Sequence, residues 1–150
     1  MALNDEPAPN ETIAAVLTIE LMLRAASGTA RQVGADYNSY MIYMTIVAAS
    51  LGRVFRADDY DPADVHLAGV ARVPGISRAA ISRTTGIPKE TVRRKVEQLL
   101  ADGLVQEGER DGSLKPNLQS NPALAESIAL NTVSLRRFGA ELRRYAHLTL

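Results

Sequence analysis

The sequence contains no cysteine among its 150 residues. This absence excludes disulfides, thiolate catalysis and zinc or iron–sulfur sites with cysteine ligands, and it is typical of proteins from reducing compartments. The first residues, MALNDEPAPNE, carry acids where a secretory signal has a basic segment, so no export signal is expected. We therefore expect a cytoplasmic protein.

Long hydrophobic runs are also missing. The longest uncharged stretch, 37–52, lies between Asp36 and Arg53 and is shorter than the roughly 20 residues of a membrane-spanning helix. It also contains Asn, Ser and Thr. We expect a buried helix there and no membrane partner.

Groups that support catalysis are few. The two histidines, His66 and His147, are isolated, and no glycine-rich phosphate loop is present. The acidic residues of the one dense cluster lack the ligand spacing of a calcium loop: they are Asp58, Asp59, Asp61 and Asp64. We expect no enzyme activity, no metal site and no cofactor.

The net charge of the chain is zero, but acidic and basic residues are concentrated in different segments. Residues 1–66 carry nine acids and four bases, a net charge of −5, whereas residues 72–95 carry seven bases and one acid, a net charge of +6. Such a local excess of positive charge is expected of a surface that faces a polyanion. A solvated, charge-rich helix pair is the alternative.

The N-terminal region predicts one amphipathic helix from Asn10 or Thr12 to about Ala26, ended by Gly28 and Gly34. Its apolar surface is wider than one stripe. We therefore expect the helix to be covered on two sides, by its own domain and by a second subunit; a helix in a larger monomeric core is the alternative.

The segment from Asp36 to about Phe55 is apolar nearly all round and predicts a central, buried helix. Its tyrosines and methionines could instead line a pocket for a small-molecule effector, because a buried tyrosine hydroxyl needs a partner and methionine adapts to irregular shapes. The pocket candidates are Tyr37, Tyr40, Tyr43 and Met44. We prefer core packing.

An acidic loop follows this helix. Asp61-Pro62 predicts the start of a short helix that ends near Gly69, and residues 70–73 predict a short strand ended by Pro74-Gly75.

Residues 77–105 predict two helices joined by a tight turn. Ser77 caps a helix over 78–85, Gly86 supplies the turn, and Pro88 takes the first position of a second helix, 88–102, closed by Gly103. The buried stripe of the second helix is Val92, Val96, Leu99 and Leu100, with Ile81 and Ile87 facing it.

A β-hairpin is predicted next. Residues 104–107 and 114–118 read as strands with Asp111-Gly112 in the connection. Pro116 lacks a backbone N–H and therefore demands an edge position.

These residues resemble the winged helix-turn-helix of bacterial transcription regulators of the MarR-like and IclR-like kinds. The resemblance lies in SRTTGIPKETV (82–92) and in LLADGLV (99–105), which place the turn glycine, the proline-opened helix and the Gly-Leu-Val entry to the wing at the family's spacing. It covers about residues 36–118. Two departures are Lys95, where the family usually has an apolar residue, and the acidic wing over 107–112.

The resemblance implies that helix 88–102 is a recognition helix in the major groove of double-stranded DNA. It places Lys89, Thr91, Arg93 and Arg94 nearest the DNA, with Arg93 or Arg94 as the reader of guanine and the others mainly as phosphate contacts. The implied phosphate contacts are Ser77, Arg78, Ser82, Arg83 and, from the wing, Arg110. Glu90 is interpreted as a favourable charge at the helix N-terminus.

The last predicted helix opens at Pro122 and runs to about His147. It carries a repeat with alternating steps of four and three, which is typical of a helix packed along another helix: Leu124, Ile128, Asn131, Leu135, Phe138, Leu142 and Tyr145. We expect a dimerisation helix, with docking onto its own domain as the alternative.

The prediction as a whole is a mainly α fold. It has an N-terminal arm and dimerisation helix over 1–35, a winged helix-turn-helix with a small β-hairpin wing over 36–119 and a C-terminal dimerisation helix over 120–150. We expect a homodimeric, DNA-binding transcription regulator. A winged helix that binds protein instead of DNA is the alternative.

Overall fold

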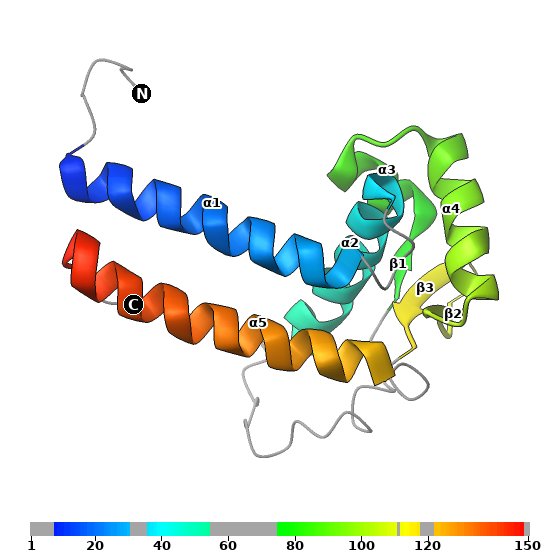
Figure 1. Ribbon diagram of the computed structural model, residues 1–150. Helices are drawn as coiled ribbons and strands as arrows, with labels where there is room; N and C mark the ends of the chain where they lie inside the picture. Colours follow the sequence, from blue (N-terminus) through cyan, green and yellow to red (C-terminus); the bar gives the residue numbers. More distant parts are fainter. Residues whose placement is uncertain (1–7, 31–35, 55–74, 111, 118–121, 149–150) are drawn as a thin grey trace. The chain divides into compact units, whose positions relative to one another are not determined.

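The computed structural model describes residues 8–30, 36–54, 75–110, 112–117 and 122–148. The fold is mainly helical, with one small three-stranded antiparallel sheet (Figure 1). The chain divides into two compact units: a terminal unit, Met1–Thr29 with Ala125–Leu150, and a central unit, Ala30–Leu124.

The central unit packs three helices against the sheet. Ile42 and Ile46 of α2 are fully buried, and they belong to one core with Ile81 of α3 and Val92 and Val96 of α4. This confirms the predicted burial of the helix over 36–55 and of one stripe of the helix over 88–102. The elements are α2 (Tyr37–Val54), β1 (Ile76–Ser77), α3 (Arg78–Thr85), α4 (Lys89–Ala101), β2 (Val105–Glu107) and β3 (Ser113–Pro116).

The turn between α3 and α4 is built from local hydrogen bonds. Gly86 adopts the left-handed conformation, with φ of 73°, and its N–H donates to the carbonyl of Ser82 at 2.9 Å. The Ser82 hydroxyl donates to the carbonyl of Ile87 at 2.7 Å, so the turn is tied on both sides. The prediction placed Pro88 inside the second helix. Instead Pro88 has an extended ψ of 141° and caps α4 from outside, and Lys89 is the first helical residue.

Helix α4 ends in a Schellman motif. Gly103 has φ of 69°, its N–H donates to Leu100, and the N–H of Leu104 donates to Leu99 at 3.0 Å. The predicted role of Gly103 is confirmed. The motif satisfies the last carbonyls of α4 and directs the chain into β2.

The strand order is β1-β3-β2, with both pairs antiparallel. The predicted hairpin is confirmed as β2 and β3. Although β3 is the central strand, the edge position expected for Pro116 is confirmed locally, because β1 does not extend to it. Strand β1 is only two residues long and pairs with β3 at Ser113 and Leu114. Pro116 therefore has a strand neighbour on one side only, Val105 of β2, and its missing N–H interrupts no second ladder.

In the terminal unit, α1 (Pro9–Ala30) lies along α5 (Pro122–Glu141), whose last turn widens into the π-helical η3 (Leu142–Ala146). Leu17 packs with Phe138 and Leu142, while Gly28 comes near Leu130, so the two helices run antiparallel. The predicted end of the first helix was too early. The helix passes through Gly28 and continues to Ala30.

The predicted repeat of the last helix is only partly covered within the chain. Phe138 and Leu142 are buried in the seam with α1, whereas Ile128 is 44% and Leu135 is 52% exposed. The repeat thus serves in part for docking onto α1 of the same chain, which was the alternative interpretation.

Two predicted elements, the short helix from Asp61 to Gly69 and the strand over 70–73, lie outside the described residues, as does Phe55. Among the described helices, none combines the length and the hydropathy that crossing a membrane requires.

Candidate nucleic-acid interface

The exposed side of α4 carries the basic residues that the sequence singled out. Lys89, Arg93 and Arg94 are exposed, while Val92 and Val96, on the opposite side of the same helix, are fully buried. Alternation of this kind follows from the helical period, because the buried stripe fixes which side chains face outward. Arg83 of α3 is also exposed.

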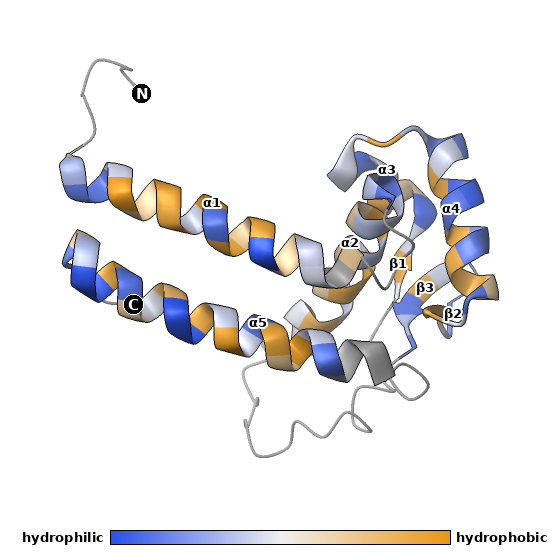
Figure 2. Cartoon of the chain, in the orientation of Figure 1, coloured by the Kyte–Doolittle hydropathy of each residue, from blue (hydrophilic) through white to orange (hydrophobic). Residues whose placement is uncertain are grey.

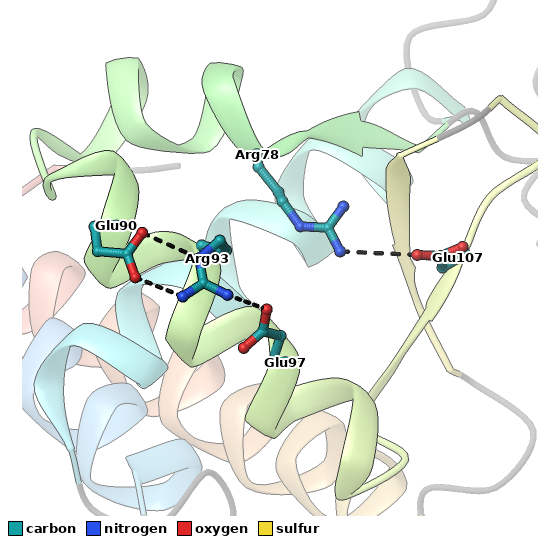
Figure 3. A network of polar contacts seen from close by, with 5 residues as sticks. All are labelled: Arg78, Glu90, Arg93, Glu97 and Glu107. Atoms are coloured by element: carbon teal, nitrogen blue, oxygen red, sulfur yellow. Dashed lines mark hydrogen bonds and ion pairs between the residues drawn. The ribbon is translucent and has the colours of Figure 1, made fainter.

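Arg93 is held between two carboxylates of its own helix (Figure 3). Its Nη2 lies 2.6 Å from Oε1 of Glu90 and its Nε donates to Oε2 of Glu90 at 3.0 Å, while Nη1 lies 2.5 Å from Oε1 of Glu97. The hydrogen bond from Arg93 lowers the pKa of the Glu90 carboxyl, and the two glutamates raise the pKa of Arg93. Arg93 is thus oriented and largely neutralised by its neighbours.

Arg94 and Lys89 differ from Arg93 in this respect. Both are exposed, and neither forms an ion pair with a residue that the structure describes. The charge of Arg94 adds slightly to the lowering of the Glu90 pKa, so the two side chains lie near each other. Thr91 is half-buried at the edge of this surface.

Arg78 links α3 to the hairpin rather than standing free. Its Nη1 donates to the carbonyl of Gly112 at 3.2 Å, and its Nη2 lies 3.7 Å from Oε1 of Glu107 (Figure 3). These contacts fix the hairpin against the start of α3. They also leave part of the guanidinium open, since its side chain is 31% exposed.

The two serines predicted to contact phosphate have structural partners. The Ser77 hydroxyl accepts a hydrogen bond from the N–H of Ala80 at 3.2 Å and caps α3, as predicted. The Ser82 hydroxyl is bound to the turn before α4. The remaining phosphate candidates with exposed basic side chains are Arg83 and Arg110.

The four pocket candidates on α2 do not share one environment. Tyr37 is 71% exposed, whereas Tyr43 is 2% exposed within the core. Tyr40 and Met44 are half-buried against that core, and burial raises the pKa of Tyr40. The structure therefore does not bring Tyr37 and Tyr43 to one surface.

Sequence reasoning missed an ion pair between α4 and the start of α2. Lys95 Nζ contacts Oδ2 of Asp36, whose carboxylate also accepts from the N–H of Asn38 at 3.1 Å and the hydroxyl of Ser39 at 3.0 Å. Asp36 therefore caps the start of α2 and also joins α2 to α4. The hydrogen bond with Lys95 lowers the pKa of the Asp36 carboxyl. The signal available in the sequence was Lys95 itself, which stands where the regulators that the chain resembles usually have an apolar residue.

No group of three His, Asp or Glu residues that could hold a metal ion occurs within the described ranges. His66 and the acidic cluster from Asp58 to Asp64 lie outside them.

The chain matches no protein-family model, no curated protein and no solved structure.

Proposed function

We propose that this chain is a winged helix-turn-helix transcription regulator that binds double-stranded DNA as a homodimer. The observation that carries the proposal is the exposed basic side of α4. Lys89, Arg93 and Arg94 project from a helix whose other side is buried in the core, and Arg83 of the preceding helix α3 is exposed as well. A rigidly held helix of this width fits the major groove, and arginine is the side chain that most often reads guanine there.

The elements around α4 support the same function. Helices α3 and α4 form the helix-turn-helix, and β2 with β3 forms the wing, which Arg78 ties to α3. The wing exposes Glu107 and Glu109, and we assign it little DNA affinity. Affinity then depends mainly on α4 and on Arg83.

The test is binding of duplex DNA from a genomic fragment library, followed by titration of a selected duplex across a salt series. Exchange of Arg93 and Arg94 for alanine abolishes selective binding and reduces the salt dependence, because phosphate contacts release counterions. The matched control is the exchange of Arg136 and Arg137, two adjacent exposed arginines of α5. Unchanged binding by R93A/R94A, or equal loss in both double variants, contradicts the proposal.

A second candidate is a protein-binding winged helix, favoured by the two carboxylates that neutralise Arg93 and by the acidic wing. Absence of any duplex binding at low salt by the folded wild-type chain favours this candidate over the first.

A further inference from the structure

The terminal unit leaves one side of α1 uncovered. Large apolar side chains on this side are exposed to an unusual degree: Val16 51%, Ile19 57%, Met22 65% and Leu23 62%. Thr12, Ala15 and Ala26 complete the same side at helical spacing. We call these seven residues the α1 outer face.

This face differs from the side that α5 already covers. Ala14, Leu17 and Leu21 pack toward α5, and at about 100° per residue they lie on the opposite side of the helix from Ile19. Helix α1 therefore has two apolar seams. Figure 2 shows apolar residues recurring along α1 between its first and last turns.

No charged residue belongs to the α1 outer face. The charged residues of the helix are Glu11, Glu20 and Arg24, and they lie beside it or toward α5. Glu20 is neutralised by Arg24, whose Nη2 lies 2.6 Å from its Oε2. Covering this face removes no charged group from water, and the burial of its apolar side chains is favourable.

The pattern of the face is symmetric about Ile19. Val16 and Met22 lie three residues before and after it, Ala15 and Leu23 lie four residues away, and Thr12 and Ala26 lie seven residues away. A two-fold axis through Ile19 thus maps the face onto itself in an antiparallel pair. Self-complementarity of this kind is what an isologous contact between identical chains requires.

The side-chain volumes fit an antiparallel pair better than a parallel one. In an antiparallel pair, Ala15 meets Leu23 of the second chain and Val16 meets Met22, so each of these two layers combines a smaller with a larger side chain. In a parallel pair, Leu23 would meet Leu23 at one end while Ala15 met Ala15 at the other, leaving uneven layers. Close packing requires layers of even volume.

We infer that the α1 outer face binds the α1 outer face of a second copy of this chain, antiparallel and with Ile19 at the two-fold axis. This inference gives the dimer of the proposed function its interface, and it rests on that function only for the use of the dimer on DNA.

Sedimentation equilibrium of the full chain without DNA tests the interface. The wild-type chain is dimeric at high concentration, and I19E, which places two carboxylates beside the two-fold axis, weakens dimerisation by at least about tenfold. V133E is the matched control, because Val133 is 65% exposed on α5 and lies outside the α1 outer face. Circular dichroism verifies that both variants are folded. A monomeric wild type, or equal effects of I19E and V133E, overturns the inference.

Cysteine crosslinking tests the orientation on a background free of native thiols. A15C mixed with L23C forms a crosslinked dimer on oxidation, whereas A15C alone does not, because its two thiols would be separated by about eight residues, or roughly 12 Å, along the helix. Efficient crosslinking of A15C alone overturns the antiparallel arrangement.

The two proposals fail in different ways. A dimer that uses the α1 outer face and binds no DNA contradicts only the proposed function. If the chain binds duplex DNA but I19E does not change its oligomeric mass, only the proposed interface is contradicted.

Discussion

Arg93 of α4 has two alternative sets of partners: the glutamates of its own helix and, under the proposed function, DNA. In the free chain it pairs with Glu90 and Glu97, and both carboxylates are exposed. Exposed pairs within a helix contribute little to stability, so in the proposed complex a DNA phosphate or a guanine edge can replace them. The carboxylates then remain near DNA as an opposing charge. Because the two carboxylates repel the DNA phosphates, only a duplex that matches α4 well gains enough binding free energy to bind tightly.

If α4 binds DNA as proposed, we predict that removing this opposing charge strengthens the binding. The double exchange E90Q/E97Q keeps the shape of both side chains, frees Arg93 and raises affinity for duplex DNA severalfold, with a larger gain on non-specific than on selected sequences. Fluorescence anisotropy at fixed salt measures both affinities, with E11Q/E126Q, on α1 and α5, as the control that changes the net charge by the same amount. Affinity unchanged or reduced in E90Q/E97Q contradicts the role assigned to the two glutamates.

Under the proposed function, Arg94 carries the discrimination between DNA sequences. R94A costs about 1–3 kcal/mol of preference for the selected duplex over a scrambled one, the range for one bidentate arginine–guanine contact. K89A instead weakens binding to both duplexes alike, because a phosphate contact reads no sequence. Competition titrations with the two duplexes separate these outcomes; loss of preference in K89A but not in R94A would reverse the assignment.

The contact between α2 and α4 has a pH dependence that follows from Asp36. Its pKa is lowered in the folded chain by Lys95, so its contribution to stability is present above the ordinary carboxyl pKa and is lost as the pH falls through the lowered value. D36N keeps a capping oxygen but removes the ion pair with Lys95, and it lowers the free energy of unfolding by up to about 1 kcal/mol at pH 7. Urea unfolding at pH 7 and at about pH 3 measures the difference, which shrinks at the lower pH. A difference independent of pH would contradict the assignment.

Two glycine exchanges with opposite outcomes test the local conformations of the helices. G86A forces a side chain into the left-handed region before α4 and destabilises by about 1 kcal/mol. G28A lies within α1, where an added Cβ makes only ordinary contact with Leu130 at 3.9 Å, and it stabilises by up to about 1 kcal/mol. Thermal unfolding of the two variants measures both; destabilisation by G28A would show that this part of α1 is more tightly packed than described.

The elements that the sequence predicted well are those set by neighbouring residues. Ser77, Gly86 and Gly103 mark the ends of α3 and α4 through their own backbone preferences, and the apolar spacing of α4 defines its buried side. The sequence could not reveal that β1 joins the hairpin at β3, because that pairing joins distant segments. The Lys95–Asp36 contact was missed for the same reason.

The candidate nucleic-acid interface was also predicted only in part from the sequence. The exposure of Lys89, Arg93 and Arg94 followed from the helical period, but their partners did not. Charge counting gave Arg93 and Arg94 the same weight, whereas side-chain geometry ties Arg93 to two carboxylates. Periodicity likewise identified the seam of α5 without showing that part of it meets α1 of the same chain.

The whole chain carries no net charge, so the proposed DNA binding would depend on the local basic surface of α4 and α3 rather than on general attraction to a polyanion. A few phosphate contacts per chain predict a moderate salt dependence, with the logarithm of the binding constant falling by about 0.9 per contact for each decade of salt. A dimer doubles the number of contacts. It also requires two half-sites related by a two-fold axis.

The most direct measurement places a DNA-cleaving reagent on α4. Because the chain has no native cysteine, K89C gives a unique attachment point for an iron chelate at the start of the helix. On a selected duplex the account predicts two clusters of cuts, one in each half-site, separated by about one turn of DNA. Cuts spread evenly along the duplex, or none where the wild-type chain binds, would contradict the claim that α4 enters the major groove.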